Sequence, residues 1–235
     1  MIPLRDNIPV RHTPLFTLAL IGVNAYVFLQ TFLLGPYGGE RFIHYYGLIP
    51  CSLTGACRVV GRVFSSDVTV MTSMFVHAGF FHFAGNMLYL WMFGNNVEDM
   101  LGHVRFLVFY LLCGVAAALA QLLLDPGSRV PMVGASGAIS GVLGAYLLLF
   151  PRARILTLVP LGLFTQFAEI PAVIVLGFWI VVQLLNGLLT FNFSGGGVAW
   201  FAHVGGFFTG LLLVRLFRRR PRPYDWGGRR AGFGF

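Results

Sequence analysis

Long stretches of this chain contain no charged side chain. The five longest such runs cover residues 12–39, 68–97, 106–124, 130–151 and 170–214. The hydrocarbon core of a bilayer is about 30 Å thick, so a helix that rises about 1.5 Å per residue needs about 20 apolar residues to cross it. The first four runs are each long enough for one crossing and the last is long enough for two. The pattern therefore predicts six transmembrane helices.

Two shorter features complete the predicted topology. Residues 192–197, Asn-Phe-Ser-Gly-Gly-Gly, interrupt the last run with turn residues, which predicts a turn at a membrane surface between the fifth and sixth helices. The apolar run 155–168 is too short to span and predicts an interfacial segment. We therefore expect an all-α membrane protein, divided into a cytoplasmic N-terminal segment 1–13, a six-helix bundle 14–217 with a long outer loop at about 36–77, and an Arg-rich cytoplasmic tail 218–235.

The composition agrees with a membrane location. Hydrophobic residues make up 57% of the chain and charged residues 10%, against roughly 25% charged residues in a soluble domain. The net charge of +8 would favour a nucleic-acid partner in a soluble protein, but arginines that flank membrane helices explain it here. We therefore predict a lipid bilayer as the surroundings of this protein and no nucleic-acid partner.

The arginines are divided unequally between the two predicted sides. Because six crossings put both termini on one side, that side holds Arg5, Arg11, Arg105, Arg152, Arg154, Arg215, Arg218, Arg219, Arg220, Arg222, Arg229 and Arg230. The opposite side holds Arg41, Arg58, Arg62 and Arg129. Cytoplasmic loops carry the excess of positive charge, so the pattern predicts a multi-pass protein of the cell membrane with both termini in the cytoplasm.

Polar residues inside the predicted spans gather at one depth. Counting about 20 residues back from the inner boundaries puts the second, fourth and sixth helices at about 78–97, 132–151 and 195–214. His82, Ser136 and His203 then lie about 6 to 12 Å below the outer surface. Asn86 follows His82 by one turn on the same helix face. Because polar groups in a bilayer are costly, this layer is a candidate functional site.

A hydroxyl and an imidazole at one depth are the minimum set for nucleophilic catalysis. A neutral serine becomes a strong nucleophile when a base within hydrogen-bond reach takes its proton, and histidine titrates near neutral pH. The predicted spans hold no carboxylate to orient such a histidine, so we expect a dyad of Ser136 and His203. The chain contains no His-Glu-x-x-His or Cys-x-x-Cys pattern, and we expect neither a metal nor a cofactor.

Glycines surround the predicted dyad. They are Gly134, Gly137 and Gly141 around Ser136, and Gly206 and Gly210 after His203. Small residues one turn apart let two membrane helices pack closely, which predicts that the fourth and sixth helices meet. The first N–H groups of the fourth helix lack helical acceptors, so they predict an oxyanion-binding position beside the serine.

The remaining polar and sulfur-containing residues have simpler interpretations. Five amides are expected to join helices through hydrogen bonds, namely Asn24, Gln30, Gln121, Gln183 and Asn186. Cys51 and Cys57 lie in the predicted outer loop, where an oxidising compartment would permit a disulfide.

Several segments of the chain resemble a known family. They are Gly134-Ala-Ser-Gly137, Ala202-His-Val-Gly-Gly206, His82-Phe-Ala-Gly-Asn86, Met74-Phe-Val-His77, Phe93-Gly-Asn-Asn-Val-Glu-Asp99 and Gly47-Leu-Ile-Pro50. With these segments in the family's order over about residues 14–217, the chain is similar to the rhomboid intramembrane serine proteases.

The resemblance implies a six-helix core that hydrolyses peptide bonds in or near the membrane helices of other proteins, with no metal or cofactor. Ser136 would be the nucleophile and His203 the general base. His82, Asn86 and the Ser136 backbone N–H would be the oxyanion donors, and water would enter from the extracytoplasmic side. In some members an aromatic residue four positions after the serine packs on the histidine, whereas this chain has Ser140 there.

Two other functions fit parts of the pattern. A catalytically silent rhomboid-like protein would bind membrane proteins for quality control or trafficking, but it would tolerate the loss of Ser136 or His203, and both are present. A transporter or channel would need ionisable groups across the whole membrane, whereas the polar layer stops in the outer half. The sequence favours a serine endopeptidase that acts on transmembrane protein substrates, which would enter laterally past the second and fifth helices.

Overall fold

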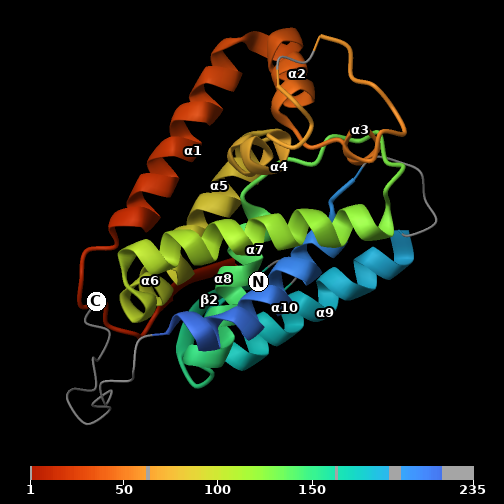
Figure 1. The fold of residues 1–235 in the computed structure, drawn as a ribbon. Helices are drawn as coiled ribbons and strands as arrows, with labels where there is room; N and C mark the ends of the chain where they lie inside the picture. The colour runs from red at the N-terminus through yellow and green to blue at the C-terminus, as the bar shows by residue number, and fades with distance from the viewer. Residues whose placement is uncertain (1, 62–63, 162–163, 191–196, 219–235) are drawn as a thin grey trace.

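The computed structural model describes residues 2–61, 64–161, 164–190 and 197–218, and most of this part of the chain is helical (Figure 1). The longest helices are α1 (Leu15–Leu33), α7 (His103–Leu124), α8 (Ser136–Leu149), α9 (Ala172–Thr190) and α10 (Trp200–Phe217). A further helical column consists of α5 (Phe80–Tyr89), the π-helical turn η2 (Leu90–Gly94) and α6 (Asn95–Leu101).

Four helices in the described part of the chain are long and apolar enough to cross a membrane, namely α1, α7, α9 and α10. The helix α8 has only 14 residues, and the column from α5 to α6 is divided into three segments. The structure therefore confirms a mostly helical protein with several candidate membrane spans. The count of six crossings and their direction stay predictions.

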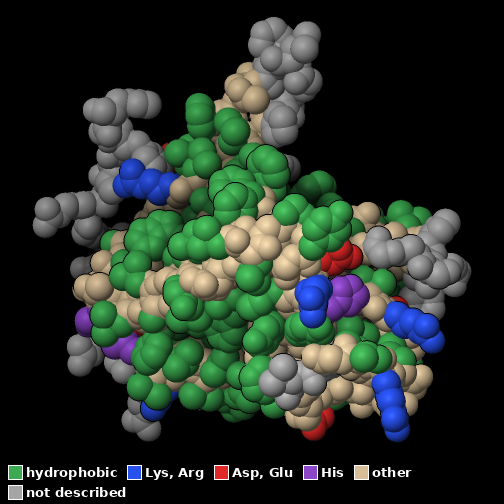
Figure 2. All heavy atoms as spheres, turned by 90° about the horizontal axis from the view of Figure 1, so that it is seen from above, with side chains coloured by type: hydrophobic (Ala, Val, Ile, Leu, Met, Phe, Trp, Pro, Cys, Tyr) green, Lys and Arg blue, Asp and Glu red, His purple; other side chains and the backbone are tan. Residues whose placement is uncertain are grey.

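Large apolar side chains lie exposed on the outward faces of these helices. Phe32 of α1 is 71% exposed, Leu123 of α7 is 81% exposed and Leu189 of α9 is 70% exposed. Figure 2 shows hydrophobic side chains over much of one face of the molecule, with scattered arginine and acidic side chains among them. An apolar surface of this extent is unfavourable in water and is suited to contact with lipid.

The helix that carries the predicted serine begins later than expected. The sequence predicts helix over about 132–151, but α8 begins at Ser136. Before it, Met132 forms an antiparallel bridge with Leu48, and Gly134 has a φ of +118°, which is incompatible with a right-handed helix. Ser136 is therefore the first residue of its helix rather than the fifth.

The sixth predicted helix also begins late, at Trp200 rather than at about 195. The predicted turn at 192–197 lies, except for its last residue, outside the described residues. His203 is the fourth residue of α10 and His82 is the third residue of α5. The three polar side chains of the predicted layer therefore all lie at the beginnings of their helices.

The structure contains a three-stranded antiparallel sheet that the sequence pattern did not predict. The strand β1 (Ile2–Asp6) pairs with β2 (Arg154–Leu161), which pairs with β3 (Phe164–Pro171). Ile155 and Thr157 are fully buried on one face of β2, whereas Arg154 is exposed. This alternation is the period of a strand with one buried face. Residues 155–161 and 164–168 of the predicted interfacial run are thus paired strands, and the predicted all-α class is wrong in this region.

Glycines take the place of side chains where α8 packs on α10. A Cβ atom added to Gly210 would lie 1.9 Å from the carbonyl oxygen of Gly141. A Cβ atom added to Gly206 would lie 2.1 Å from the carbonyl oxygen of Gly137. These separations are too short for any side chain, so the two backbones are in direct contact. The predicted packing of the two glycine-containing faces is observed.

Three carboxylates, Glu98, Asp99 and Asp6, join neighbouring elements near the C-terminal end of α8. Glu98 accepts hydrogen bonds from the backbone N–H groups of Phe16 at 2.9 Å and Thr17 at 2.7 Å. The Thr17 hydroxyl also donates to Glu98 at 2.7 Å, and His103 Nδ1 lies 2.6 Å away. Because no N-cap side chain bonds to the start of α1, Glu98 supplies the missing acceptor.

The second carboxylate in this region, Asp6, is the last residue of β1. Its Oδ2 atom accepts hydrogen bonds from the Tyr146 hydroxyl at 2.5 Å and from Asn96 Nδ2 at 2.7 Å. Burial raises the pKa of Asp6, although the hydrogen bond from Tyr146 opposes that shift. The third carboxylate, Asp99, lies 2.6 Å from His12 Nδ1. These contacts join the N-terminal segment to α6 and α8.

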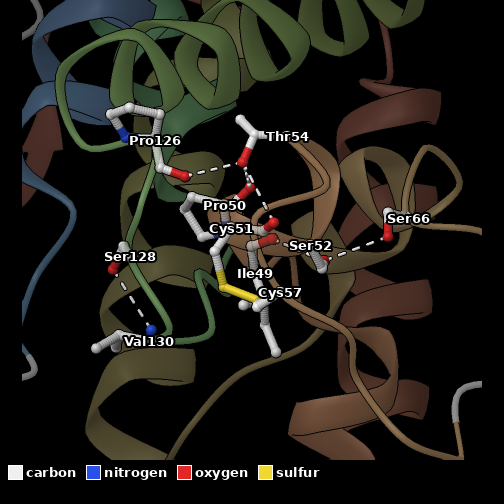
Figure 3. The surroundings of a disulfide bond; sticks show 10 residues. All are labelled: Ile49, Pro50, Cys51, Ser52, Thr54, Cys57, Ser66, Pro126, Ser128 and Val130. Atoms are coloured by element: carbon white, nitrogen blue, oxygen red, sulfur yellow. Dashed lines mark hydrogen bonds between the residues drawn. A yellow bond between two sulfur atoms is a disulfide. The ribbon is translucent and has the colours of Figure 1, made fainter.

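The loop between α1 and α5 carries a disulfide between Cys51 and Cys57 (Figure 3). The loop contains α2 (Gly35–Tyr46), α3 (Pro50–Leu53), α4 (Thr69–Thr72) and the 3-10 turn η1 (Ser73–Phe75). The Cys51 N–H donates to the Ser128 carbonyl at 2.9 Å, and the Thr54 hydroxyl donates to the Pro126 carbonyl at 3.2 Å. The disulfide that the sequence would permit is present, and its loop supports the segment that leads into α8.

Candidate active site

The side chains of Ser136 and His203 meet where α8 and α10 begin. The His203 Nε2 atom lies 2.8 Å from the Ser136 Oγ atom, although the two residues are 67 positions apart in the sequence. This is a normal hydrogen-bond distance. It is also the separation at which an imidazole can accept the proton of an attacking serine.

Glycine at position 134 leaves room for a second histidine beside the serine. A Cβ atom there would lie 2.7 Å from His82 Nε2 and 3.6 Å from Ser136 Oγ. Its φ of +118° is also a conformation that residues with a side chain rarely adopt. The segment before α8 therefore needs glycine both for its backbone and for the approach of the His82 ring.

His82 and Asn86, the predicted oxyanion donors, both lie on α5 and line the cavity beside Ser136. Asn86 is 7% exposed, and its Nδ2 donates to the carbonyl of His82 at 2.9 Å. An amide nitrogen carries two hydrogens, so this bond uses only one of them. The backbone N–H of Ser136 lies in the first turn of α8, where N–H groups have no acceptor within the helix.

Gln183, which the sequence predicts only as an amide that joins helices, lies beside the dyad. The Gln183 Oε1 atom lies 2.8 Å from His203 Nδ1, so the imidazole lies between Ser136 and Gln183. Gln183 is 6% exposed and lies on α9. Nothing in the sequence distinguishes Gln183 from the other amides of the predicted spans, because its role depends on how α9 packs beside α10.

Two tryptophans flank the same histidine. The ring centroids of Trp179 and Trp200 lie 6.0 and 6.3 Å from that of His203. Ser140, four positions after Ser136 on α8, does not supply an aromatic ring and donates its hydroxyl to the carbonyl of Ser136 at 2.6 Å. Aromatic contact with the imidazole therefore comes from α9 and from the first residue of α10, rather than from α8.

A further buried histidine, His77, lies next to the site and was not among the predicted site residues. It is 1% exposed, and its ring centroid lies 5.1 Å from that of His82. Burial and the neighbouring His82 lower the pKa of His77 to about 4. The neutral ring accepts a long hydrogen bond, 3.5 Å, from the N–H of Ala135 at its Nε2 atom. His77 thus contacts the residue immediately before the predicted nucleophile.

A cavity of about 1140 Å³ lies beside Ser136 and His203. Its walls include Tyr89 of α5, Gln121 of α7 and Trp179 of α9. This volume exceeds that of most small-molecule pockets and would hold water or several residues of an extended peptide. Among the residues that the structure describes, no group of three or more His, Cys, Asp or Glu side chains is placed to hold a metal ion.

Comparison with known proteins assigns the family. Residues 66–220 match the Rhomboid domain. The chain belongs to the rhomboid family. The matched region of this rhomboid contains His82, Asn86, Ser136, Gln183 and His203.

Several individual rhomboids are similar to this chain. Rhomboid protein 1, mitochondrial, of Saccharomyces cerevisiae is 32% identical over 157 residues, which cover 63% of this chain and 41% of the yeast protein. RHOMBOID-like protein 1 of Arabidopsis thaliana is 35% identical over 179 residues, covering 74% and 41%. Rhomboid protease GluP of Bacillus subtilis is 34% identical over 145 residues, covering 62% and 25%. The chain thus spans less than half the length of each of these relatives.

Proposed function

We propose that this rhomboid is an intramembrane serine endopeptidase that hydrolyses peptide bonds in or near the transmembrane helices of other membrane proteins. The observation that carries the proposal is the 2.8 Å separation of Ser136 Oγ and His203 Nε2 beside a cavity of about 1140 Å³. The similarity to Rhomboid protease GluP supports the same activity.

Acylation would proceed as follows. His203 accepts the Ser136 hydroxyl proton at Nε2 while Oγ attacks the substrate carbonyl carbon, and the carbonyl electron pair moves onto its oxygen. The backbone N–H of Ser136 and the side chains of His82 and Asn86 donate hydrogen bonds to this oxyanion. The imidazolium then gives the proton to the leaving amine as the C–N bond breaks. One fragment departs and the other remains as an ester on Ser136.

Deacylation needs a water molecule, for which the cavity provides space. His203 accepts a proton from this water, and the resulting hydroxide attacks the ester carbonyl. The C–O bond to Ser136 then breaks, and the serine oxygen recovers a proton from the imidazolium. The products are a carboxylic acid and the free enzyme, so neither an oxidant nor a metal is consumed.

The substrate must expose a peptide carbonyl to Ser136, yet a helical backbone is already hydrogen-bonded to itself. We therefore expect substrates with small or helix-weakening residues near the outer interface. Entry between α5 and α9 would bring such a segment directly into the cavity, since both helices line it. The arginine distribution supports a cell-membrane enzyme with both termini in the cytoplasm and the site open to the extracytoplasmic side.

The test is cleavage of a panel of transmembrane substrates in liposomes, with the product ends identified by mass spectrometry. Ser136→Ala and His203→Ala should each abolish cleavage and leave the thermal unfolding midpoint close to that of the wild type. A serine-directed phosphonate should label Ser136 in the wild type. The matched control is His44→Ala, which removes an exposed histidine of α2 and should cleave normally.

Full cleavage by Ser136→Ala would overturn the proposed chemistry. A folded wild-type protein that cleaves no substrate and takes no phosphonate, but still retains membrane helices, would instead identify a catalytically silent binding protein.

His82→Ala and Asn86→Ala test the oxyanion position. Each substitution should lower kcat by about 10²- to 10³-fold, with a smaller effect on KM, because a lost oxyanion donor weakens the transition state more than the bound substrate. Steady-state kinetics with one soluble reporter substrate measures both constants. An unchanged kcat in both variants would remove these side chains from the proposed mechanism.

A further inference from the structure

Gln183 holds the side of the His203 ring that faces away from the serine. Its Oε1 atom lies 2.8 Å from His203 Nδ1, and His203 Nε2 lies 2.8 Å from Ser136 Oγ. The three side chains come from α8, α9 and α10. They form a continuous chain of hydrogen-bonding groups from the amide to the hydroxyl.

The orientation of the Gln183 amide follows from its second contact. Its Nε2 atom lies 3.3 Å from the backbone carbonyl oxygen of Trp179, one turn earlier on α9. A carbonyl oxygen only accepts, so the NH₂ group of the amide must face Trp179. The amide oxygen therefore faces the imidazole.

An amide oxygen also only accepts, and this determines the tautomer of the histidine. His203 must carry its proton on Nδ1 in order to donate to Gln183. In the neutral ring Nε2 is then unprotonated, with its lone pair directed at the Ser136 hydroxyl. This is the only neutral form in which the imidazole can accept the serine proton.

We propose that Gln183 is a positioning residue that completes a Ser136–His203–Gln183 triad by holding His203 in its Nδ1–H tautomer. The inference rests on the proposed protease function, because it assigns to an uncharged amide the task that a carboxylate performs in many serine hydrolases. The amide oxygen also stabilises the imidazolium of the transition state. Because it is neutral, it does so without placing a second ionised group in the membrane.

The first experiment compares Gln183→Met and Gln183→Glu with the wild type. Methionine matches the length of the side chain but has no oxygen acceptor, so kcat should fall about 10- to 100-fold with little change in KM. Glutamate keeps the acceptor and adds a charge, so it should retain most of the activity and move the acidic limb of the pH–rate profile to higher pH.

A merely structural role for Gln183 predicts the reverse order, because a membrane helix tolerates methionine better than glutamate. The matched control is Asn186→Leu. Asn186 lies on the same helix and makes the same kind of bond, from its Nδ2 to the Val182 carbonyl at 2.8 Å. That control should keep the wild-type kcat. Wild-type kcat and an unchanged pH profile in Gln183→Met would overturn the inference.

The second experiment does not depend on turnover. Nitrogen-15 NMR of histidine-labelled protein, assigned with His203→Ala, should show His203 protonated at Nδ1 in the wild type and a mixture of tautomers in Gln183→Met. A wild-type ring protonated at Nε2, or a tautomer that Gln183→Met does not alter, would also overturn the inference. If the tautomer is as expected but the wild type cleaves nothing, only the proposed function fails.

Discussion

Polar side chains gather around both ends of α8, but the two groups are used differently. The near end is the N-terminal end at Ser136, and the far end is the C-terminal end beside Tyr146. At the far end the carboxylate of Glu98 accepts three hydrogen bonds and contacts His103, so its acceptor sites are filled. At the near end Ser136 and His203 lie beside a large cavity, and the first N–H groups of α8 have no acceptor within the helix. The far end joins helices to one another, whereas the near end lines a cavity and, under the proposed function, keeps groups available for a substrate.

The two ends also differ in what brings the helices together. At the far end side chains cross between elements, as when Asp6 of β1 contacts Tyr146 of α8. Near the site α8 and α10 meet through bare backbone, at Gly137 and Gly206 and again at Gly141 and Gly210. Because these contacts are between backbone atoms, no side chain can change its conformation to make room for an added group. The position of the His203 ring relative to Ser136 should therefore be more sensitive to a single added methyl group than the far end is.

The strongest test of this difference is Gly210→Ala. The added Cβ would lie 1.9 Å from the Gly141 carbonyl oxygen, so α10 must move away from α8. We expect a loss of about 3 kcal/mol or more in unfolding free energy, which is a fall of at least about 6 °C in the unfolding midpoint, and loss of cleavage. Thermal unfolding in detergent and the liposome cleavage assay measure the two effects.

Gly177→Ala is the matched control for that substitution. Gly177 lies on α9, and a Cβ atom there meets nothing within 4 Å. Alanine should leave cleavage unchanged and could add up to about 1 kcal/mol of stability, since it favours helix more than glycine does. Equal behaviour of Gly210→Ala and Gly177→Ala would show that backbone contact does not control the site.

The next effect in size is expected at the far end. Glu98→Ala leaves the first N–H groups of α1 and the Thr17 hydroxyl without their acceptor, so the unfolding free energy should fall by about 2 kcal/mol. This corresponds to a fall of roughly 4–8 °C in the unfolding midpoint. The kcat of the protein that remains folded should stay near the wild-type value. Glu98→Gln keeps one acceptor oxygen, so its unfolding midpoint should lie between those of the wild type and Glu98→Ala. A selective loss of kcat in Glu98→Ala would contradict the division of roles between the two ends.

The smallest expected effect is a dependence of stability on pH that originates at Asp6. Burial raises its pKa above the ordinary value of 3.8, so the folded protein binds a proton more tightly there than the unfolded chain does. Stability from this group is therefore greatest below pH 3.8 and falls as the pH rises through the raised folded value. Asp6→Asn should remove this part of the slope when unfolding midpoints are compared from acidic to neutral pH. Identical slopes in the two proteins would contradict the prediction.

Charge-free runs predicted a helical membrane protein, because hydrophobic length is a local property of a sequence. The polar residues within those runs predicted four residues that line the cavity, namely His82, Asn86, Ser136 and His203. The hairpin of β2 and β3 was missed because a 14-residue apolar run does not distinguish strand from helix by length alone. The late start of α8 was missed because Gly134 contacts His82 and the loop between α1 and α5, and these contacts accompany its positive φ. Gln183 was missed because only the packing of α9 beside α10 gives it a histidine to contact.

The pairing of β1 with β2 has a consequence for the order of biosynthesis. Ile2 lies opposite Leu158 and Asp6 lies opposite Ile155. The residues of β1 therefore cannot pair until residues about 150 positions later have been translated. Contacts of such long sequence separation form slowly and late. By then α1, α5 to α7 and α8 have already left the ribosome. The sheet is therefore a late step in folding, and β1 pairs with β2 only after the helix that carries Ser136 has been made.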